Sequence, residues 1–313
     1  MSERQTPAAP RAAGHEPPAT SFARPPSAPG ATSHEARPER VEGPPATSPA
    51  RPPAAHIPRM IGIICNWCCY GGADLCGVSR FQYPPYIRLI RVMCSARVDL
   101  AHILRAFSNG ADGVFVGGCH LNDCHYVTNG NYDALGMARI CSKLLALVGV
   151  NPERFRLEWV SAGEGVRFAS IMNEFGPRVQ KLGPLGSSEG IAPEELRLKL
   201  EAATRIVPYL RLALAEKLQA PRRFRASADP QAGLDAFFAS EEFATLFEAT
   251  VADKLVVSEI LLLLRRKPLS TAEIAKYLRL RPAEVSRHMN ASSRQGLVRF
   301  DAGRGCYSLA RVG

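Results

Sequence analysis

The stretch that decides the fold is RMIGIICNWC, residues 59–68, in which an apolar run leads directly into two cysteines. Met60 to Ile64 has the length and the continuous apolar character of a strand that is buried on both faces. Cys65 and Cys68 follow in a C-x-x-C pattern, where the predicted strand ends. The stretch therefore predicts a strand of a parallel sheet that carries thiols at its carboxyl end.

Three further apolar runs predict three more strands, which are Ile87 to Met93, Gly113 to Val116 and Leu157 to Val160. Between them, apolar side chains at helical spacing predict helices over 98–109, 135–148 and 168–175. Strands that alternate with helices are typical of a parallel sheet covered on both faces. We therefore expect an α/β fold with a small, doubly wound, flavodoxin-like sheet. No G-x-G-x-x-G follows the first strand, so the sequence gives no support to a dinucleotide site.

Composition divides the chain of 313 residues into parts. Of its 25 prolines, 14 lie in residues 1–58, which hold almost no large apolar side chains and cannot offset the entropy of ordering. We expect a disordered Pro/Ala-rich tail over 1–58, an α/β domain over 59–183, a helical connector over 184–250 and a basic C-terminal domain over 251–313. The chain shows no signal peptide and no apolar run of about 18 residues, so we expect it to be cytoplasmic.

The chain has nine cysteines, an odd number that excludes complete pairing in disulfides. In a cytoplasmic protein, clustered thiols more often bind metal or carry redox chemistry. Because the carboxyl ends of parallel strands meet at one edge of a sheet, the cysteines that follow the first three strands are expected to converge there. These are Cys65, Cys68, Cys94, Cys119 and Cys124. Thiolates suit zinc or an iron–sulfur cluster, and the spacing alone leaves the metal open.

The other cysteines are expected to have different roles. Cys141 lies on the apolar face of its predicted helix and Cys306 lies in a predicted hairpin, so both are expected to be structural. Cys69 and Cys76 are ambiguous. Two histidines directly follow cysteines and are expected to contact solvent or to support the ligands, because adjacent side chains diverge; they are His120 and His125.

A resemblance to a known family rests on several segments, which are CNWC at 65–68, YPP at 83–85, IRVMCS at 90–95, GVFVGGCHLNDCHY at 113–126 and RLEW at 156–159 with Ser161-Ala162. Over about residues 60–182 the chain resembles the delta subunit of methyl-viologen-reducing hydrogenase. The resemblance implies a small electron-transfer subunit with a 2Fe-2S cluster. It also implies partners, namely a hydrogenase or formate dehydrogenase and the flavin subunit of a heterodisulfide reductase. The ligands that it favours are Cys68, Cys94, Cys119 and Cys124, with Cys65 as the fifth candidate.

Two features depart from the pattern of this family. Leu121-Asn122 replaces the usual Pro-Gly between Cys119 and Cys124, and Cys69 is additional. Neither removes a candidate ligand. The replacement of Pro-Gly by Leu121-Asn122 means that the family pattern does not predict the turn geometry of this loop. No set of catalytic acid, base and substrate pocket is evident, so we expect a non-catalytic electron carrier. A zinc-bound scaffold is the alternative that the thiols leave open.

The basicity of the chain belongs to residues 251–313, which hold twelve Lys and Arg against five Asp and Glu. An apolar helix over 251–266 is followed by a capping-box match at Ser270 and Glu273 and by a further helix that ends near Gly296. Two short apolar runs then predict a hairpin over 297–309. This order resembles the winged helix-turn-helix of small bacterial repressors.

In a DNA complex, the side chains expected to face the major groove are Ser286, Arg287, Asn290 and Arg294, and Arg304 is expected to contact phosphate or the minor groove. Winged helices also dock proteins, so two functions stay open. The chain is either an electron-transfer subunit whose terminal domain docks partners, or a redox-responsive DNA-binding regulator that uses the cluster as a sensor. The first predicts tight association with a flavoprotein, and the second predicts DNA affinity that falls with salt and changes with cluster oxidation.

Overall fold

The computed structural model describes residues 56–126, 130–217 and 229–310. Contacts divide the chain into the units 1–52 and 53–313, and all described residues belong to the second. The expected disordered tail over 1–58 therefore lies outside the described residues, apart from its last three positions.

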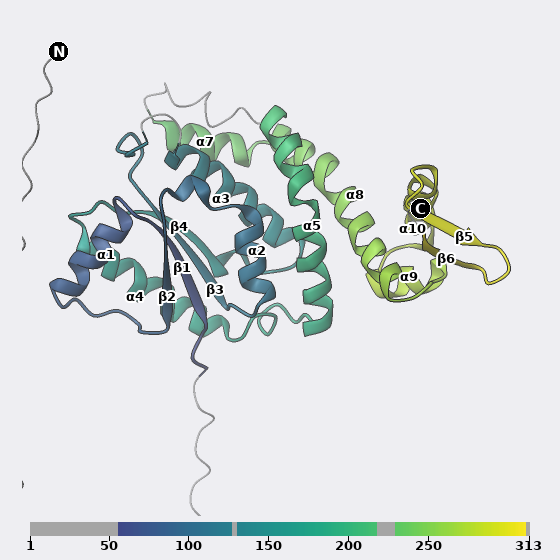
Figure 1. Cartoon of the computed structure of the whole chain (residues 1–313), viewed down its shortest axis with the longest axis horizontal. Helices are drawn as coiled ribbons and strands as arrows, with labels where there is room; N and C mark the ends of the chain where they lie inside the picture. The colour runs from purple at the N-terminus through teal and green to yellow at the C-terminus, as the bar shows by residue number, and fades with distance from the viewer. Residues whose placement is uncertain (1–55, 127–129, 218–228, 311–313) are drawn as a thin grey trace, which may run out of the picture. The chain divides into compact units, whose positions relative to one another are not determined.

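A parallel sheet of four strands forms the centre of the cysteine-bearing part (Figure 1). The strands are β1 (Met60–Cys65), β2 (Ile87–Val92), β3 (Gly113–Gly118) and β4 (Phe155–Trp159). Their order in the sheet is β2-β1-β3-β4, and each neighbouring pair is parallel. The predicted doubly wound α/β sheet is confirmed. Its winding reverses between β1 and β3, so the loops that follow these two strands diverge there.

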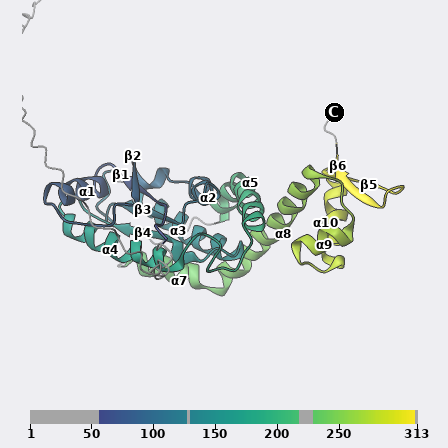
Figure 2. The ribbon, with the colours of Figure 1, turned by 90° about the horizontal axis from the view of Figure 1, so that it is seen from below.

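Helices cover both faces of the sheet (Figures 1 and 2). One face carries α1 (Cys69–Val78) and α4 (Gly165–Leu182), which pack on side chains such as Ile64 and Phe115. The other face carries α2 (Leu100–Ser108) and α3 (Gly130–Leu147), which pack around Ile63 and Val116, and α5 (Pro193–Lys217) packs on α2 outside this layer. Side chains alternate along a strand, so β1 and β3 contribute to both layers of core.

The sequence pattern does not predict α1, because its segment CYGGADLCGV contains three glycines. The glycines serve close packing instead. A Cβ at Gly72 would lie 2.8 Å from the carbonyl oxygen of Ser161 and 2.8 Å from Val160 Cγ1. Helix α1 therefore forms where the loop after β4 leaves no room for larger side chains.

The amino edge of the sheet is held by Arg154, whose side chain is fully buried. Its guanidinium donates to both carboxylate oxygens of Glu189 at 2.6 and 3.1 Å, and to the main-chain carbonyls of Asp112, Leu182, Gly183 and Pro184. Arg154 thus connects the start of β3 to the carboxyl end of α4 and the loop that follows.

The rest of the described chain is mainly helical, with α7 (Pro230–Ala239), α8 (Glu241–Arg266), α9 (Thr271–Leu278), α10 (Pro282–Arg294), β5 (Val298–Asp301) and β6 (Cys306–Leu309). The predicted capping box is present, since Ser270 and Glu273 exchange hydrogen bonds at the start of α9. Strands β5 and β6 pair antiparallel as the predicted hairpin. Helix α8 begins before residue 251, where the C-terminal domain was expected to start, and the domain division stays a prediction. Among the helices of the described residues, none has both the length and the apolar character needed to cross a bilayer.

Candidate functional site

The five predicted cysteines lie together at the carboxyl edge of the sheet. Cys65 is the last residue of β1, and its Sγ lies 3.6 Å from Sγ of Cys119, which directly follows β3. Cys68 lies near enough to interact with Cys119, because each thiol affects the pKa of the other. The sulfurs of Cys94 and Cys124 both lie beside Gly130, and Cys94 also interacts electrostatically with Cys65. The thiols therefore form one cluster, centred where the winding of the sheet reverses.

Burial within this cluster is uneven. The side chains of Cys65, Cys94 and Cys119 are buried, whereas those of Cys68 and Cys124 are half-buried. The cluster therefore opens to solvent on the side of Cys68 and Cys124.

The electrostatics of the buried thiols depend on their mutual hydrogen bonds. Hydrogen bonding with the Cys119 thiol lowers the pKa of Cys65 to about 6, with further help from the main-chain N–H groups of Cys68, Trp67 and Ser95. The same bond raises the pKa of Cys119. Burial raises the pKa of Cys68 and of Cys94. The thiolate of Cys65 is thus stabilised, whereas ionisation of Cys68, Cys94 and Cys119 is disfavoured, and a bound cation would favour ionisation of these three.

Gly130, the first residue of α3, leaves room for two of the sulfurs. A Cβ at this position would lie 2.5 Å from Sγ of Cys124 and 2.9 Å from Sγ of Cys94. No larger residue fits without moving those sulfurs. The sequence carries no pattern that marks this glycine, because its partners come from other loops.

Of the remaining cysteines, Cys69 lies beside the cluster, where it interacts electrostatically with Cys65 and Cys68, and the other three lie outside it. Cys69 and Cys76, the two ambiguous residues, are buried in the core under α1, and Cys76 donates to the carbonyl of Phe81. Cys141 is buried in the opposite layer of core. Cys306 is half-buried in the β5–β6 hairpin, where its thiol lies 3.3 Å from the carbonyl of Arg304.

Three aromatic side chains join the loops of the half-buried Cys68 and Cys124, and of these three the sequence pattern marks only His125. The rings of Trp67 and His125 stack with centroids 3.8 Å apart and an angle of 17°. Trp67 Nε1 also donates to the hydroxyl of Tyr126 at 3.3 Å. Trp67 lies between Cys65 and Cys68, and the other two follow Cys124, so the stack connects both loops on the open side of the cluster.

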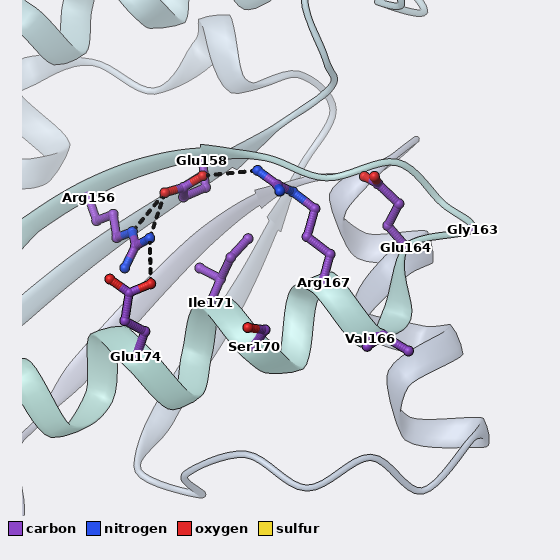
Figure 3. A pocket seen from close by; sticks show the side chains of 9 residues that line it. All are labelled: Arg156, Glu158, Gly163, Glu164, Val166, Arg167, Ser170, Ile171 and Glu174. Atoms are coloured by element: carbon purple, nitrogen blue, oxygen red, sulfur yellow. Dashed lines mark hydrogen bonds and ion pairs between the residues drawn. The ribbon is translucent and has the colours of Figure 1, made fainter.

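The second histidine next to a cysteine has a different partner. Nε2 of His120 lies 2.7 Å from Glu164 Oε2, at the start of α4. Glu164 also lines a pocket of about 620 Å³ between β4 and α4 (Figure 3). The pocket is lined mainly by charges that neutralise one another, since Arg156 pairs with Glu158 and Glu174. It holds none of the predicted site residues.

The donor set of the cluster fits a soft metal centre. Thiolates are the ligands that zinc and iron–sulfur clusters prefer, and the cradle at Gly130 keeps space beside Cys94 and Cys124. Within the part of the chain that the structure describes, no three His, Cys, Asp or Glu side chains already have the spacing that encloses a metal ion. The thiols are therefore close together, and their positions alone do not select one metal or one set of ligands.

The predicted DNA-facing residues lie on α10 and in the hairpin. Arg287, Asn290 and Arg294 are exposed on α10, Ser286 is half-buried there, and Arg304 is exposed in the turn between β5 and β6. Arg287 is not free, since it pairs with Asp253 of α8 at 3.2 Å.

The fold and the site define a class of protein, namely a small α/β protein with a thiol cluster at the carboxyl edge of a parallel sheet. The sequence profile of the family described as "Methyl-viologen-reducing hydrogenase, delta subunit" matches residues 60–183. An iron-sulfur subunit of the F420-non-reducing hydrogenase of Archaeoglobus profundus is 52% identical over 127 residues, which are 41% of this chain and 92% of that relative. The chain therefore belongs to the family of this delta subunit.

In two further relatives, the matched segment makes up very different shares of the chain. An iron-sulfur subunit of the vhc F420-non-reducing hydrogenase of Methanococcus voltae is 50% identical over 127 residues, 41% of this chain and 88% of the relative. One subunit of the ferredoxin/F(420)H(2)-dependent CoB-CoM heterodisulfide reductase of Methanosarcina acetivorans is 46% identical over 130 residues, 42% of this chain. The match covers 16% of that longer protein.

A second family profile, described as "Bacterial regulatory protein, arsR family", matches residues 256–299. The matched residues run from α8 through α9 and α10 into β5. The predicted resemblance of this part to a helix-turn-helix regulator is thereby confirmed.

Proposed function

We propose that this chain is an iron–sulfur electron-transfer subunit of an oxidoreductase complex and is not itself catalytic. The observation that carries the proposal is the convergence of five cysteines from three strand ends on one point of the sheet edge. The relatives named as iron-sulfur subunits support it, because the match spans nearly their whole length.

The proposed cofactor is a 2Fe-2S cluster, with zinc as the alternative. The proposed ligands are Cys68, Cys94, Cys119 and Cys124. When bound, the cluster would supply reversible one-electron chemistry, with a potential that depends on hydrogen bonds to sulfur and on exposure. Cys65 is the fifth candidate ligand, since its sulfur lies 3.6 Å from Sγ of Cys119.

The surroundings determine where electrons enter and leave. Two of the proposed ligands, Cys94 and Cys119, are buried, and Cys68 and Cys124 are half-buried. A partner must therefore approach on the side where Trp67 stacks on His125. On the opposite side the sulfurs of Cys94 and Cys119 are buried, which keeps water away from a bound centre.

The proposed partners are a hydrogenase or formate dehydrogenase as donor and a heterodisulfide-reductase-like flavoprotein as acceptor. The Methanosarcina relative supports the second, since the matched sequence there is part of a longer chain of a heterodisulfide reductase. We further propose the domain division 59–183, 184–250 and 251–313 after a tail over 1–58, with the C-terminal domain as a docking module.

The test is anaerobic purification of the full chain, with iron and sulfide analysis and EPR before and after dithionite reduction. We expect about two irons and two sulfides per chain and an EPR signal that appears on reduction. A protein that holds only zinc, after cluster reconstitution has failed, would contradict the proposal.

A second candidate is a redox-responsive DNA-binding regulator, which the arsR-family match over residues 256–299 favours. Three predicted contact residues are exposed on α10, and the segment from residue 251 carries the basicity of the chain. It is tested by fluorescence anisotropy with labelled duplexes selected from genomic DNA, using oxidised and reduced protein. Sequence-specific binding that changes with cluster oxidation would support this role over docking alone.

A further inference from the structure

The first turn of α3 contacts the loop between Cys119 and Cys124 through a buried amide. Asn131 is 1% exposed, and its Nδ2 donates to the main-chain carbonyls of Cys119 at 3.2 Å and of His120 at 2.5 Å. A primary amide has two N–H hydrogens, so both are used. The two carbonyls belong to the two consecutive peptide planes that follow Cys119, so the amide fixes the orientation of the main chain there.

The next residue of α3 contacts the middle of the same loop. The hydroxyl of Tyr132 donates to Asn122 Oδ1 at 2.5 Å. Asn122 has a φ of 69°, in the left-handed region that glycine adopts without cost and asparagine tolerates. Asn122 thus takes the conformation that the usual Pro-Gly pair of the family would provide, and Tyr132 holds its side chain.

We propose that Asn131 is a positioning residue of the thiol site, and that Tyr132 secures the turn between its two cysteines. Asn131 fixes the main chain at Cys119, Tyr132 fixes the turn at Asn122, and Gly130 leaves the space into which the Cys124 sulfur projects. Three consecutive residues of α3 therefore set the directions of two proposed ligands. The inference rests on the proposed function, because it concerns the cluster that those ligands would hold.

The test compares Asn131→Ala with wild type in the full chain, after anaerobic purification. The readouts are the rate of iron release to a chelator, the EPR g values of the reduced protein and the midpoint potential. Loss of a residue that orients a ligand weakens metal binding by about 10-fold or more. We therefore expect release to be at least about 10-fold faster, with shifted g values and a shifted potential.

The control is Asn173→Ala on α4, which makes the same substitution at an exposed asparagine whose amide donates to the carbonyl of Gln82 at 2.9 Å, away from the thiols. It should leave all three readouts at wild-type values. Wild-type release rate, g values and potential in Asn131→Ala would overturn the proposal. A wild-type protein that never holds iron would instead overturn the proposed function itself.

A second pair of variants keeps the proposal testable if Asn131→Ala does not fold. Tyr132→Phe should also speed iron release, because the turn at Asn122 loses its hydrogen bond. Adding Asn122→Gly should restore slow release, since glycine adopts the positive φ without support. Equal release rates for wild type and Tyr132→Phe, or no rescue in the double variant, would overturn the role given to the first turn of α3.

Discussion

Cys65 and Cys68 are separated by two residues but have different surroundings. The sulfur of Cys65 is buried and lies among main-chain N–H groups and the Cys119 thiol, whereas Cys68 is half-buried on the open side. Cys68 is the proposed ligand on the open side, and Cys65 is the fifth candidate.

Serine substitution tests that assignment. Cys68→Ser, Cys94→Ser, Cys119→Ser and Cys124→Ser should each lose most of the bound iron, because a hard hydroxyl replaces a thiolate. Cys65→Ser should keep about two irons with altered EPR g values. Iron per chain is the measurement, and Cys306→Ser in the hairpin is the control. Iron lost from Cys65→Ser and kept in Cys68→Ser would exchange the two roles.

For single residues, the sequence predicts that the thiols converge, but it does not predict the residues that hold them in place. Each of the five cysteines follows a predicted strand or closes a short C-x-x-C or C-x4-C spacing, so their convergence can be inferred from topology alone. Gly130 and Asn131 cannot be found in this way, because their contacts depend on where α3 begins relative to loops distant in sequence.

Among the elements, β1 and β3 are predictable because each is a short apolar run that ends at a cysteine. Helix α1 is not predictable, because three of its ten residues are glycines and its apolar side chains show no helical spacing. Its position depends on close packing against the loop after β4. Helix α8 is longer than its sequence pattern indicates, because the apolar spacing from residue 251 is strong whereas the preceding turns are more polar.

The packing of β3 and α4 depends on Arg154. Arg154→Met should lower the free energy of unfolding by about 3–5 kcal/mol, because it leaves the buried Glu189 without a partner. Urea unfolding of cluster-free protein, followed by far-UV circular dichroism, measures this. The double variant Arg154→Met/Glu189→Met should recover much of the loss. A single variant as stable as wild type would show that this ion pair does not hold the amino edge.

Helix α8 carries a buried acid. Burial raises the pKa of Glu259 to about 7, with a further rise from Glu195 and an opposing effect of Lys199. Between pH 4.5, the ordinary value, and about 7, the folded chain keeps a proton that the unfolded chain has released. The contribution of this group to stability is therefore complete below that window and falls as pH rises through it, by up to about 3 kcal/mol.

Glu259→Gln should remove this pH dependence, and Glu248→Gln at an exposed position of the same helix should retain it. Urea unfolding at intervals from pH 4.5 to 8 measures the difference. A Glu259→Gln variant whose stability changes with pH as wild type does would exclude Glu259 as the titrating group.

In the whole molecule, the thiol cluster and the excess of positive charge lie in different parts of the chain. The thiol cluster belongs to the α/β part, and the excess of basic residues belongs to the part from residue 251 onward. If that part binds DNA, the logarithm of affinity should fall linearly with the logarithm of salt concentration. Arg294→Ala should reduce the slope by about 1 for a lost phosphate contact. Arg265→Ala, at an exposed position of α8, is the control and should leave the slope unchanged. If the protein shows no salt-dependent binding to DNA, protein docking is left as the role of this part.

The measurement that tests the central claim most directly is EPR of anaerobically purified full chain, with iron and sulfide determined on the same sample. Reduction with dithionite should produce a signal that integrates to about one spin per two irons, with equal sulfide. A colourless protein with zinc and no signal, unchanged after reconstitution with iron and sulfide, would contradict the assignment of the thiol cluster to electron transfer.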